Sequence, residues 1–324
     1  MPSRKSPRKG SLQFWPRKRA KKFLPRVNWD IIPSDSSKNI KGFICYKAGM
    51  STAYVKDETP DSMTKGKRIS VPVTILKCPP LKIFSVRLYK NGNVVKEILS
   101  ENLDKELKRK VKLPKNQGKG AGSFLNSFDS SKAEEFDDVK IVCYSHVKKT
   151  GIKKTPDLSE IGLSGNLEEK INFIKEKIGK EISVVDVFEK GSLVDFRGLT
   201  KGKGFSGPMK RFGISLKQSK SEKGRRRPGS IGPWHPARVT FRVPMAGQLG
   251  MFTRLSYNNS ILDIGKAEEK NKLKGFSGFE GLKTDYIVVR GSVQGPSKRQ
   301  LLITAPLRET KKQKKKSFEF LELR

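Results

Sequence analysis

Positive charge along this chain is concentrated in three segments, and this uneven placement limits how the chain can fold more than any other feature. Residues 1–26 contain ten lysines or arginines and no acidic residue, residues 197–228 contain eleven against Glu222, and residues 308–316 contain six against Glu309. Segments with this density of like charge resist compaction, because their charges repel one another and few apolar side chains are available for burial. We therefore expect a folded body that carries separate basic arms.

The charge balance of the whole chain indicates a polyanionic partner. The 324 residues include 69 basic and 32 acidic side chains, a net charge of +37, whereas residues 100–190 are nearly neutral, with 18 basic and 16 acidic side chains. Nucleic acid is favoured, because each neutralised phosphate releases condensed counterions. A membrane partner is disfavoured, because the sequence has no apolar run of about 18 residues, no signal peptide and no lipidation motif. We expect a soluble intracellular protein.

The segments between the arms are predicted to be mainly β. Short runs rich in Ile, Val and aromatic residues are bounded by turn residues, which is typical of strands. The dipeptide Asn91-Gly92 predicts a hairpin with a type I′ turn. Strands are predicted at 40–47, at 69–76, on both sides of that turn within 83–99, at 139–147, on both sides of Lys190-Gly191 within 182–200, and at 237–243, 284–290 and 300–304.

One helix is predicted with defined ends. Asn166 can cap it, Glu169 completes a capping box, apolar residues then recur at helical spacing, and Gly179 ends it. A second, shorter helix is predicted at about 101–110. Strands before and after this mixed stretch predict a β-barrel that is interrupted by an insertion. The predicted division is a basic N-terminal arm at 1–35, the barrel at 36–80 and 181–310, an α/β insertion at 80–180, a central basic extension at 197–248, and a basic C-terminal tail at 308–324.

The N-terminal arm interleaves its basic residues with the aromatic residues Phe14, Trp15, Phe23 and Trp29. A segment of this composition cannot bury enough surface to offset its chain entropy, so we expect it to be disordered until it binds. Aromatic rings among basic side chains suit stacking on bases, while the basic side chains neutralise phosphates.

Catalytic and metal sites are not indicated. Cys45, Cys78 and Cys143 are widely spaced and lie in apolar segments, so they are interpreted as buried structural thiols rather than zinc ligands. His146 alternates with apolar neighbours and is interpreted as structural, and the segment around His235 holds no acidic residue or cysteine. The stretch GLTKGKGFSG at 198–207 lacks the spacing of a phosphate-binding loop, and no cofactor motif is present.

Trp234 lies in an unusual segment, GSIGPWHPARV at 229–239. Prolines flank the Trp-His pair, two glycines precede it, and Arg225, Arg226 and Arg227 stand upstream. This composition predicts a rigid exposed loop tip rather than a strand or helix. An indole held in this way can stack on unpaired RNA bases.

These motifs together resemble one family. PRKGSLQFWPRKRA (7–20), FRGLTKGKGFSGPMKRFGI (196–214), GSIGPWHPARV (229–239) and MAGQLG (245–250) are similar, in this order, to the motifs of the universal large-subunit ribosomal protein three family in its archaeal and eukaryotic form. The resemblance covers essentially the whole chain. It departs at Glu222, where eukaryotic members can carry a methylated histidine, so no such modification is expected.

The resemblance implies a six-stranded translation-protein-type β-barrel with an α/β insertion and long basic extensions. It also implies a structural role in the large ribosomal subunit in the cytoplasm, binding to large-subunit (23S-type) ribosomal RNA near its 3′ end, contacts with neighbouring ribosomal proteins, and early assembly. The central extension would reach toward the peptidyl-transferase region, with Trp234 at its tip.

An RNA-modifying enzyme and a free RNA chaperone are the alternatives. Neither a catalytic site nor a cofactor is expected, and the predicted RNA-binding residues are Arg4, Lys5, Arg8, Trp15, Arg17, Lys18, Arg19, Lys201, Lys203, Lys210, Arg211, Arg225, Arg226, Arg227, Trp234, His235 and Arg238.

Overall fold

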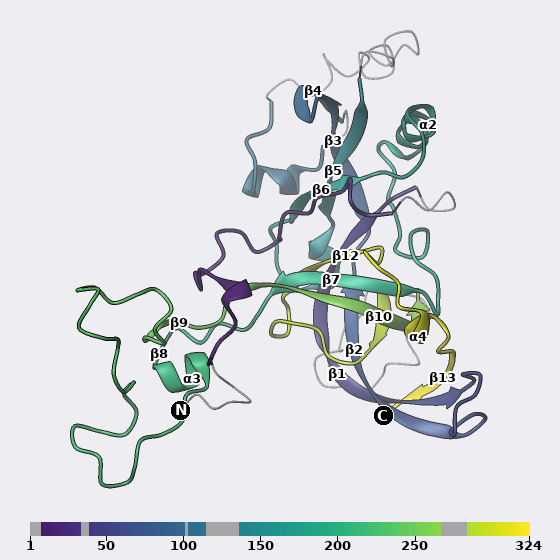
Figure 1. The fold of residues 1–324 in the computed structure, drawn as a ribbon. Coiled ribbons are helices and arrows are strands. Elements are labelled where there is room, and N and C mark those ends of the chain that lie inside the picture. Colours follow the sequence, from purple (N-terminus) through teal and green to yellow (C-terminus); the bar gives the residue numbers. More distant parts are fainter. Residues whose placement is uncertain (1–7, 34–38, 101–102, 115–135, 267–283) are drawn as a thin grey trace. The chain divides into compact units, whose positions relative to one another are not determined.

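The computed structural model describes residues 8–33, 39–100, 103–114, 136–266 and 284–324, and the chain divides into two compact units. The basic unit consists of residues 1–23 and 199–254, and the body consists of residues 24–198 and 255–324. Figure 1 follows the chain through both units, from purple at the N-terminus to yellow at the C-terminus. In the described residues, none of the helices is long and apolar enough to cross a membrane.

A large sheet forms the centre of the body, and the protein is mainly β, as predicted. Its strand order is β12-β7-β10-β11-β2-β1-β13, and β12 pairs with β1 as well as with β7. The pairings of β1 with β2, β12 and β13 are antiparallel, as are those of β11 with β2 and β10. The strands are β1 (Gly42–Asp57), β2 (Arg68–Cys78), β7 (Leu193–Leu199), β10 (Thr253–Gly265), β11 (Asp285–Arg290), β12 (Gln300–Thr304) and β13 (Phe318–Leu323).

The burial pattern of β1 explains where the core lies. Its first seven residues are buried in succession, so both faces of the strand are covered there, whereas Ala53, Val55 and Asp57 are buried in alternation farther along. Residues 43–46 belong to the main core, whereas Ala53 and Val55 belong to a smaller cluster that includes Val71 and Val288. Continuous burial followed by alternation is the pattern of a strand that passes from an enclosed region to a surface-facing one.

A second sheet, in the order β4-β3-β5-β6, lies within the body. Asn91 and Gly92 have φ values of 51° and 74°, so the predicted type I′ turn joins its first two strands. The predicted helix is α2 (Leu167–Lys177), and the Glu169 carboxylate accepts a hydrogen bond from the Asn166 N–H at 3.1 Å. The strands are β3 (Leu81–Lys90), β4 (Asn93–Leu99), β5 (Asp138–Ser145) and β6 (Leu158–Gly162).

Several predicted elements are corrected by the structure. Residues 182–189 form no continuous strand: Ile182 makes an isolated bridge with Leu81, and residues 184–187 then turn, with Val184, Val187 and Phe188 burying their side chains at a spacing of three and four. Residues 237–243 form an exposed loop with no strand partner. The helix predicted at 101–110 is a 3-10 turn, Lys105–Arg109, although residues 101–102 lie outside the described residues. The strands β6, β10 and β13 were not predicted.

Trp29 also departs from its prediction as a stacking residue of the arm. Its side chain is only 3% exposed and packs in the main core. A Cβ atom at Gly42 or at Gly162 would lie 2.7 Å from the Trp29 side chain, so both strands approach the indole closely. The buried Lys41 ammonium donates to the Trp29 and Ile32 carbonyl oxygens at 3.3 and 3.0 Å. Residues 24–33 are therefore part of the body and not of a disordered arm.

Candidate nucleic-acid interface

The central segment of the basic unit begins and ends in a short two-stranded stem. Strand β8 (Phe205–Ser206) pairs with β9 (Gly247–Gln248), and backbone hydrogen bonds extend the stem from Lys203 to Leu249 and from Thr200 to Phe252. Gly250 has a φ of 77°, and a Cβ atom there would clash with the Lys201 carbonyl oxygen. A glycine is needed at this position because the two backbones approach closely.

Helix α3 (Pro208–Phe212) follows the stem and is the centre of an aromatic cluster. The ring of Trp15 stacks on the ring of Phe212 at 5.9 Å and meets Phe241 edge-on at 5.6 Å. The Arg17 guanidinium lies over the Phe212 ring, 4.3 Å from its centroid. Phe212 is 6% exposed. Trp15 and Arg17 of the N-terminal segment thus both pack on Phe212 of the central segment.

Arginine side chains connect the same segments through main-chain carbonyl groups. Arg211 donates to the carbonyl oxygens of Gln248 at 3.0 Å, Met245 at 3.1 Å and Arg17 at 3.3 Å, and Arg17 donates to the Arg211 carbonyl oxygen at 2.6 Å. Burial lowers the pKa of Arg17, and the nearby charges of Arg211, Arg254 and Arg8 lower it further. These like charges lie close together without an acidic residue between them, which is unfavourable unless an anion neutralises them.

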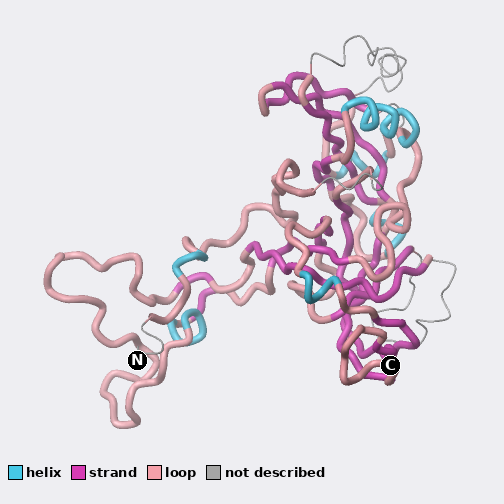
Figure 2. Tube along the Cα trace, turned by 45° about the vertical axis from the view of Figure 1, so that its right-hand side comes forward, coloured by secondary structure: helices cyan, strands magenta, loops and turns pink. Residues whose placement is uncertain are grey.

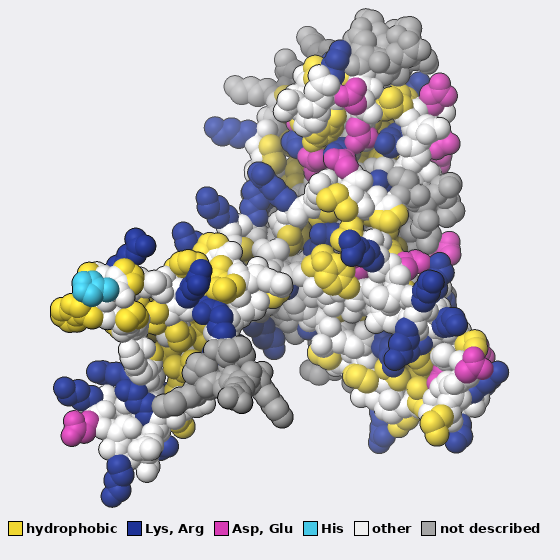
Figure 3. All heavy atoms as spheres, in the orientation of Figure 1, with side chains coloured by type: hydrophobic (Ala, Val, Ile, Leu, Met, Phe, Trp, Pro, Cys, Tyr) yellow, Lys and Arg dark blue, Asp and Glu magenta, His cyan; other side chains and the backbone are white. Residues whose placement is uncertain are grey.

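The remaining predicted contact residues are mostly exposed. Arg8 and Trp15 are half-buried, and Arg4 and Lys5 lie outside the described residues. The basic unit contains 22 lysines and arginines and one acidic residue, Glu222. Figure 3 shows the dark-blue side chains of this unit spread among hydrophobic ones. The exposed predicted residues are Lys18, Arg19, Lys201, Lys203, Lys210, Arg225, Arg226, Arg227, Trp234, His235 and Arg238.

Residues 214–246 form a long excursion beyond α3, and Figure 2 shows this part of the unit mostly as loop. Trp234 is 88% exposed, which confirms its predicted exposure. Local bonds shape the loop: Lys217 and Arg225 exchange hydrogen bonds at 3.2 Å, and the Ser230 hydroxyl donates to the Gly232 carbonyl oxygen at 3.1 Å. The loop therefore presents its indole and its arginines to solvent.

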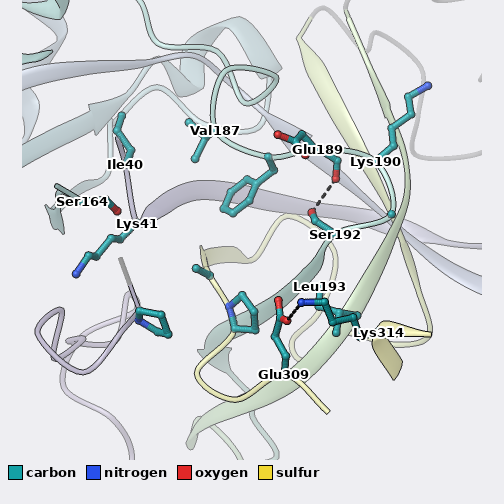
Figure 4. Close-up of a pocket in the computed structure, with 15 residues that line it drawn as sticks. Ile40, Lys41, Ser164, Val187, Glu189, Lys190, Ser192, Leu193, Glu309 and Lys314 are labelled. Atoms are coloured by element: carbon teal, nitrogen blue, oxygen red, sulfur yellow. Dashed lines mark hydrogen bonds and ion pairs between the residues drawn. The ribbon is translucent and has the colours of Figure 1, made fainter. Parts of the chain in front are cut away.

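The body contains a pocket lined by residues that include Lys41, Glu189, Ser192, Glu309 and Lys314 (Figure 4). Two of its polar side chains already have internal partners. The Ser192 hydroxyl donates to the Glu189 carbonyl oxygen at 2.7 Å, and Glu309 pairs with Lys314 at 2.8 Å. No nucleophile stands beside a free general base among these lining residues, so the pocket does not form a catalytic arrangement.

The buried cysteines and His146 have structural surroundings. Cys45, Cys78 and Cys143 are free thiols in the core, and burial raises the pKa of each. The His146 Nε2 atom lies 2.9 Å from an oxygen of Asp104, which confirms its packed position. Within the described residues, no group of histidine, cysteine and acidic side chains could hold a metal ion.

A β-rich body that carries a separate unit of basic loops is typical of proteins that contact a folded polyanion. A family model for ribosomal protein L3 matches residues 1–323. The large ribosomal subunit protein uL3 of Methanocaldococcus jannaschii is 40% identical over 313 residues, which cover 93% of this chain and 91% of that protein. Those of Methanobrevibacter smithii and Archaeoglobus fulgidus are each 39% identical, covering 94% of this chain and 93% of each relative.

The chain therefore belongs to the ribosomal protein L3 family. It is a ribosomal protein of the large subunit, acting in translation in the cytoplasm, and not an enzyme. Phe205 was not predicted as a contact residue, although its position near the glycines of GKGFSG is a signal in the sequence. Phe212 and Phe241 were not predicted either, because their partner Trp15 lies far away in the sequence.

Proposed function

We propose that the protein is held in the large ribosomal subunit by its basic unit, which binds large-subunit ribosomal RNA. The observation that carries this proposal is the ratio of 22 basic side chains to one acidic side chain in a unit that is nevertheless folded. Such a unit repels itself in the free protein, and RNA phosphates remove that repulsion.

The predicted contact residues divide into two groups in this proposal. The exposed lysines and arginines neutralise phosphates directly, because their charged ends face solvent. Trp15, Arg17 and Arg211 hold the N-terminal and central segments together, since their rings and guanidinium groups already have internal partners. This division supports a preformed interface rather than an arm that orders only on binding.

The resemblance to the family extends the proposal to the place of binding. We propose that the RNA contacted includes the region near the 3′ end, that binding occurs early in subunit assembly, and that neighbouring ribosomal proteins contact the body. The loop at 214–246 would carry Trp234 toward the peptidyl-transferase region. The 88% exposure of that indole supports this role.

For the body we propose a six-stranded barrel of the translation-protein type, formed by β1, β2, β7, β10, β11 and β12. The pairing of β12 with both β7 and β1 supports closure. The second sheet and α2 fall within 80–180, which supports the proposed insertion at those residues. The central extension at 197–248 keeps its predicted boundaries as part of the same proposal. The N-terminal arm shortens to residues 1–23, because residues 24–33 pack in the body, and the C-terminal tail at 308–324 includes β13, which pairs with β1.

The salt dependence of RNA binding tests the proposed function. Each neutralised phosphate contributes about 0.7–0.9 to the slope of log affinity against log salt concentration. The variant R226Q/R227Q should therefore bind protein-free large-subunit RNA with a slope that is smaller by about 1.5. The matched control K65Q/K67Q removes two exposed lysines from the body and should keep the wild-type slope. Equal slopes for the wild type and R226Q/R227Q would contradict the proposal.

A further inference from the structure

Phe205 combines an exposed side chain with a fixed backbone. Its side chain is 82% exposed, although its backbone lies in β8 and pairs with Gln248. On one side of it, the Lys203 N–H donates to the Leu249 carbonyl oxygen at 3.0 Å and the Leu249 N–H donates to the Gly204 carbonyl oxygen at 2.8 Å. On its other side, α3 begins three residues later. The ring is therefore presented from a rigid stem.

The surroundings of the ring are open. A Cβ atom at Gly204 or at Gly207 would have no atom within 4 Å, so the neighbours of Phe205 leave space beside it. The nearest basic residues along the chain, Lys201 and Lys203, are both exposed. Single exposed apolar residues are common and need no explanation. A ring on a hydrogen-bonded stem, flanked by glycines and lysines, is a more specific arrangement.

We propose that Phe205 stacks on an unpaired base of ribosomal RNA, as a second aromatic contact separate from the loop tip. This inference rests on the proposed RNA-binding function of the basic unit. Aromatic rings beside cationic side chains are the usual platform for unstacked bases, and the cations suit the adjoining phosphates. A protein partner is disfavoured, because a unit with a single acidic residue, Glu222, would require a strongly acidic surface opposite it.

The fixed backbone distinguishes Phe205 from Trp234. Trp234 lies in a long loop with few main-chain hydrogen bonds, whereas Phe205 lies in a strand whose backbone pairs with β9. A ligand that binds a preformed group loses less conformational freedom than one that must order a loop. Phe205 should therefore contribute more to the affinity for RNA, and Trp234 more to contacts made after assembly.

Substitution of Phe205 in the full-length chain tests the inference. Phe205→Ala should weaken binding to protein-free large-subunit RNA by about 5- to 150-fold, the range measured for the loss of one stacked base. Phe205→Trp should retain binding, since a larger ring still stacks. The thermal unfolding temperature of the free protein should not change in either variant, because the side chain is mostly solvent-exposed. Met63→Ala is the matched control, since Met63 is an exposed apolar residue of the body, and its affinity should equal that of the wild type.

Photo-crosslinking identifies the partner. A benzoylphenylalanine at position 205 in assembled large subunits should crosslink to RNA; a crosslink only to another ribosomal protein would overturn the inference, as would wild-type affinity in Phe205→Ala. These failures differ from failure of the proposed function, in which the wild-type protein itself would not bind the RNA.

Discussion

Different interactions stabilise the body and the basic unit of this protein, each within itself. The body buries long apolar strands, and buried polar side chains such as Tyr46 have specific partners there, in this case Ser145 and Asp157. The described residues of the basic unit form short strands, a 3-10 helix at Leu12–Phe14 and the five-residue α3, and the unit depends on aromatic rings, guanidinium groups and main-chain carbonyl oxygens. The comparison shows that a segment rich in charge can fold when arginine side chains supply the hydrogen bonds that regular secondary structure supplies elsewhere.

The largest expected effect distinguishes the two units by their tryptophans. Trp29→Ala removes a buried indole from the body and should lower the free energy of unfolding by about 3–5 kcal/mol. Trp234→Ala removes an exposed indole from the basic unit and should change it by less than about 0.5 kcal/mol. Urea unfolding of the free protein, followed by circular dichroism, measures both values. Equal effects would show that residues 24–33 are not part of the body.

A smaller effect is expected within the basic unit. Arg17→Met keeps an apolar chain of similar length but removes the guanidinium group. The hydrogen bond to the Arg211 carbonyl oxygen and the cation–π contact with the Phe212 ring are lost, so the substitution should destabilise this unit by about 2 kcal/mol. Amide hydrogen exchange at residues 211–213 would report the change as a loss of protection. Lys18→Met changes the neighbouring exposed residue and should leave protection unaltered. If Arg17→Met also kept its protection, the N-terminal segment would not stabilise α3.

The same contrast explains which parts of the fold could be predicted from the sequence. Strands of the body were predicted where local pattern and burial agree, as at β11 and at the Asn91-Gly92 turn. Strand β10 was missed because its polar residues resemble a turn. Asn258 has a φ of 52°, and the buried Asp195 carboxylate accepts its N–H at 2.7 Å, which a local pattern cannot reveal.

Prediction of the candidate site was limited by long-range packing. The exposure of Trp234 followed from the prolines and glycines around it, and the structure confirms that exposure. The prediction of a strand at 237–243 was wrong, because the alternating apolar side chains of this segment have no sheet to pack against. Phe241 instead contacts Trp15, more than 200 residues away in the sequence. The same contact gives Trp15 an internal partner that its basic neighbours did not indicate.

The smallest expected effect concerns the two histidines, one in each unit. Burial lowers the pKa of His146, and although Asp104 opposes this shift, Lys82 adds to it. Burial would raise the pKa of Asp104, but the Tyr144 hydroxyl, His146 and Lys82 together hold it below its usual value, so this carboxylate stays ionised near neutral pH. His146 is therefore the group of this cluster whose lowered pKa makes the unfolded state bind a proton more readily than the folded state as the pH falls.

The sign of the pH dependence follows from these shifts. An unfolded histidine has a pKa of about 6.5, so the unfolded state takes up protons first as the pH falls, and the folded state loses stability below about pH 6.5. The slope from one such group is at most about 1.4 kcal/mol per pH unit. His146→Gln should make the fall in unfolding free energy between pH 7 and 5.5 shallower, whereas His235→Gln, at an exposed position of the basic unit, should keep the wild-type slope. A shallower slope in the His235 variant alone would place the titrating group in the basic unit and reverse the comparison.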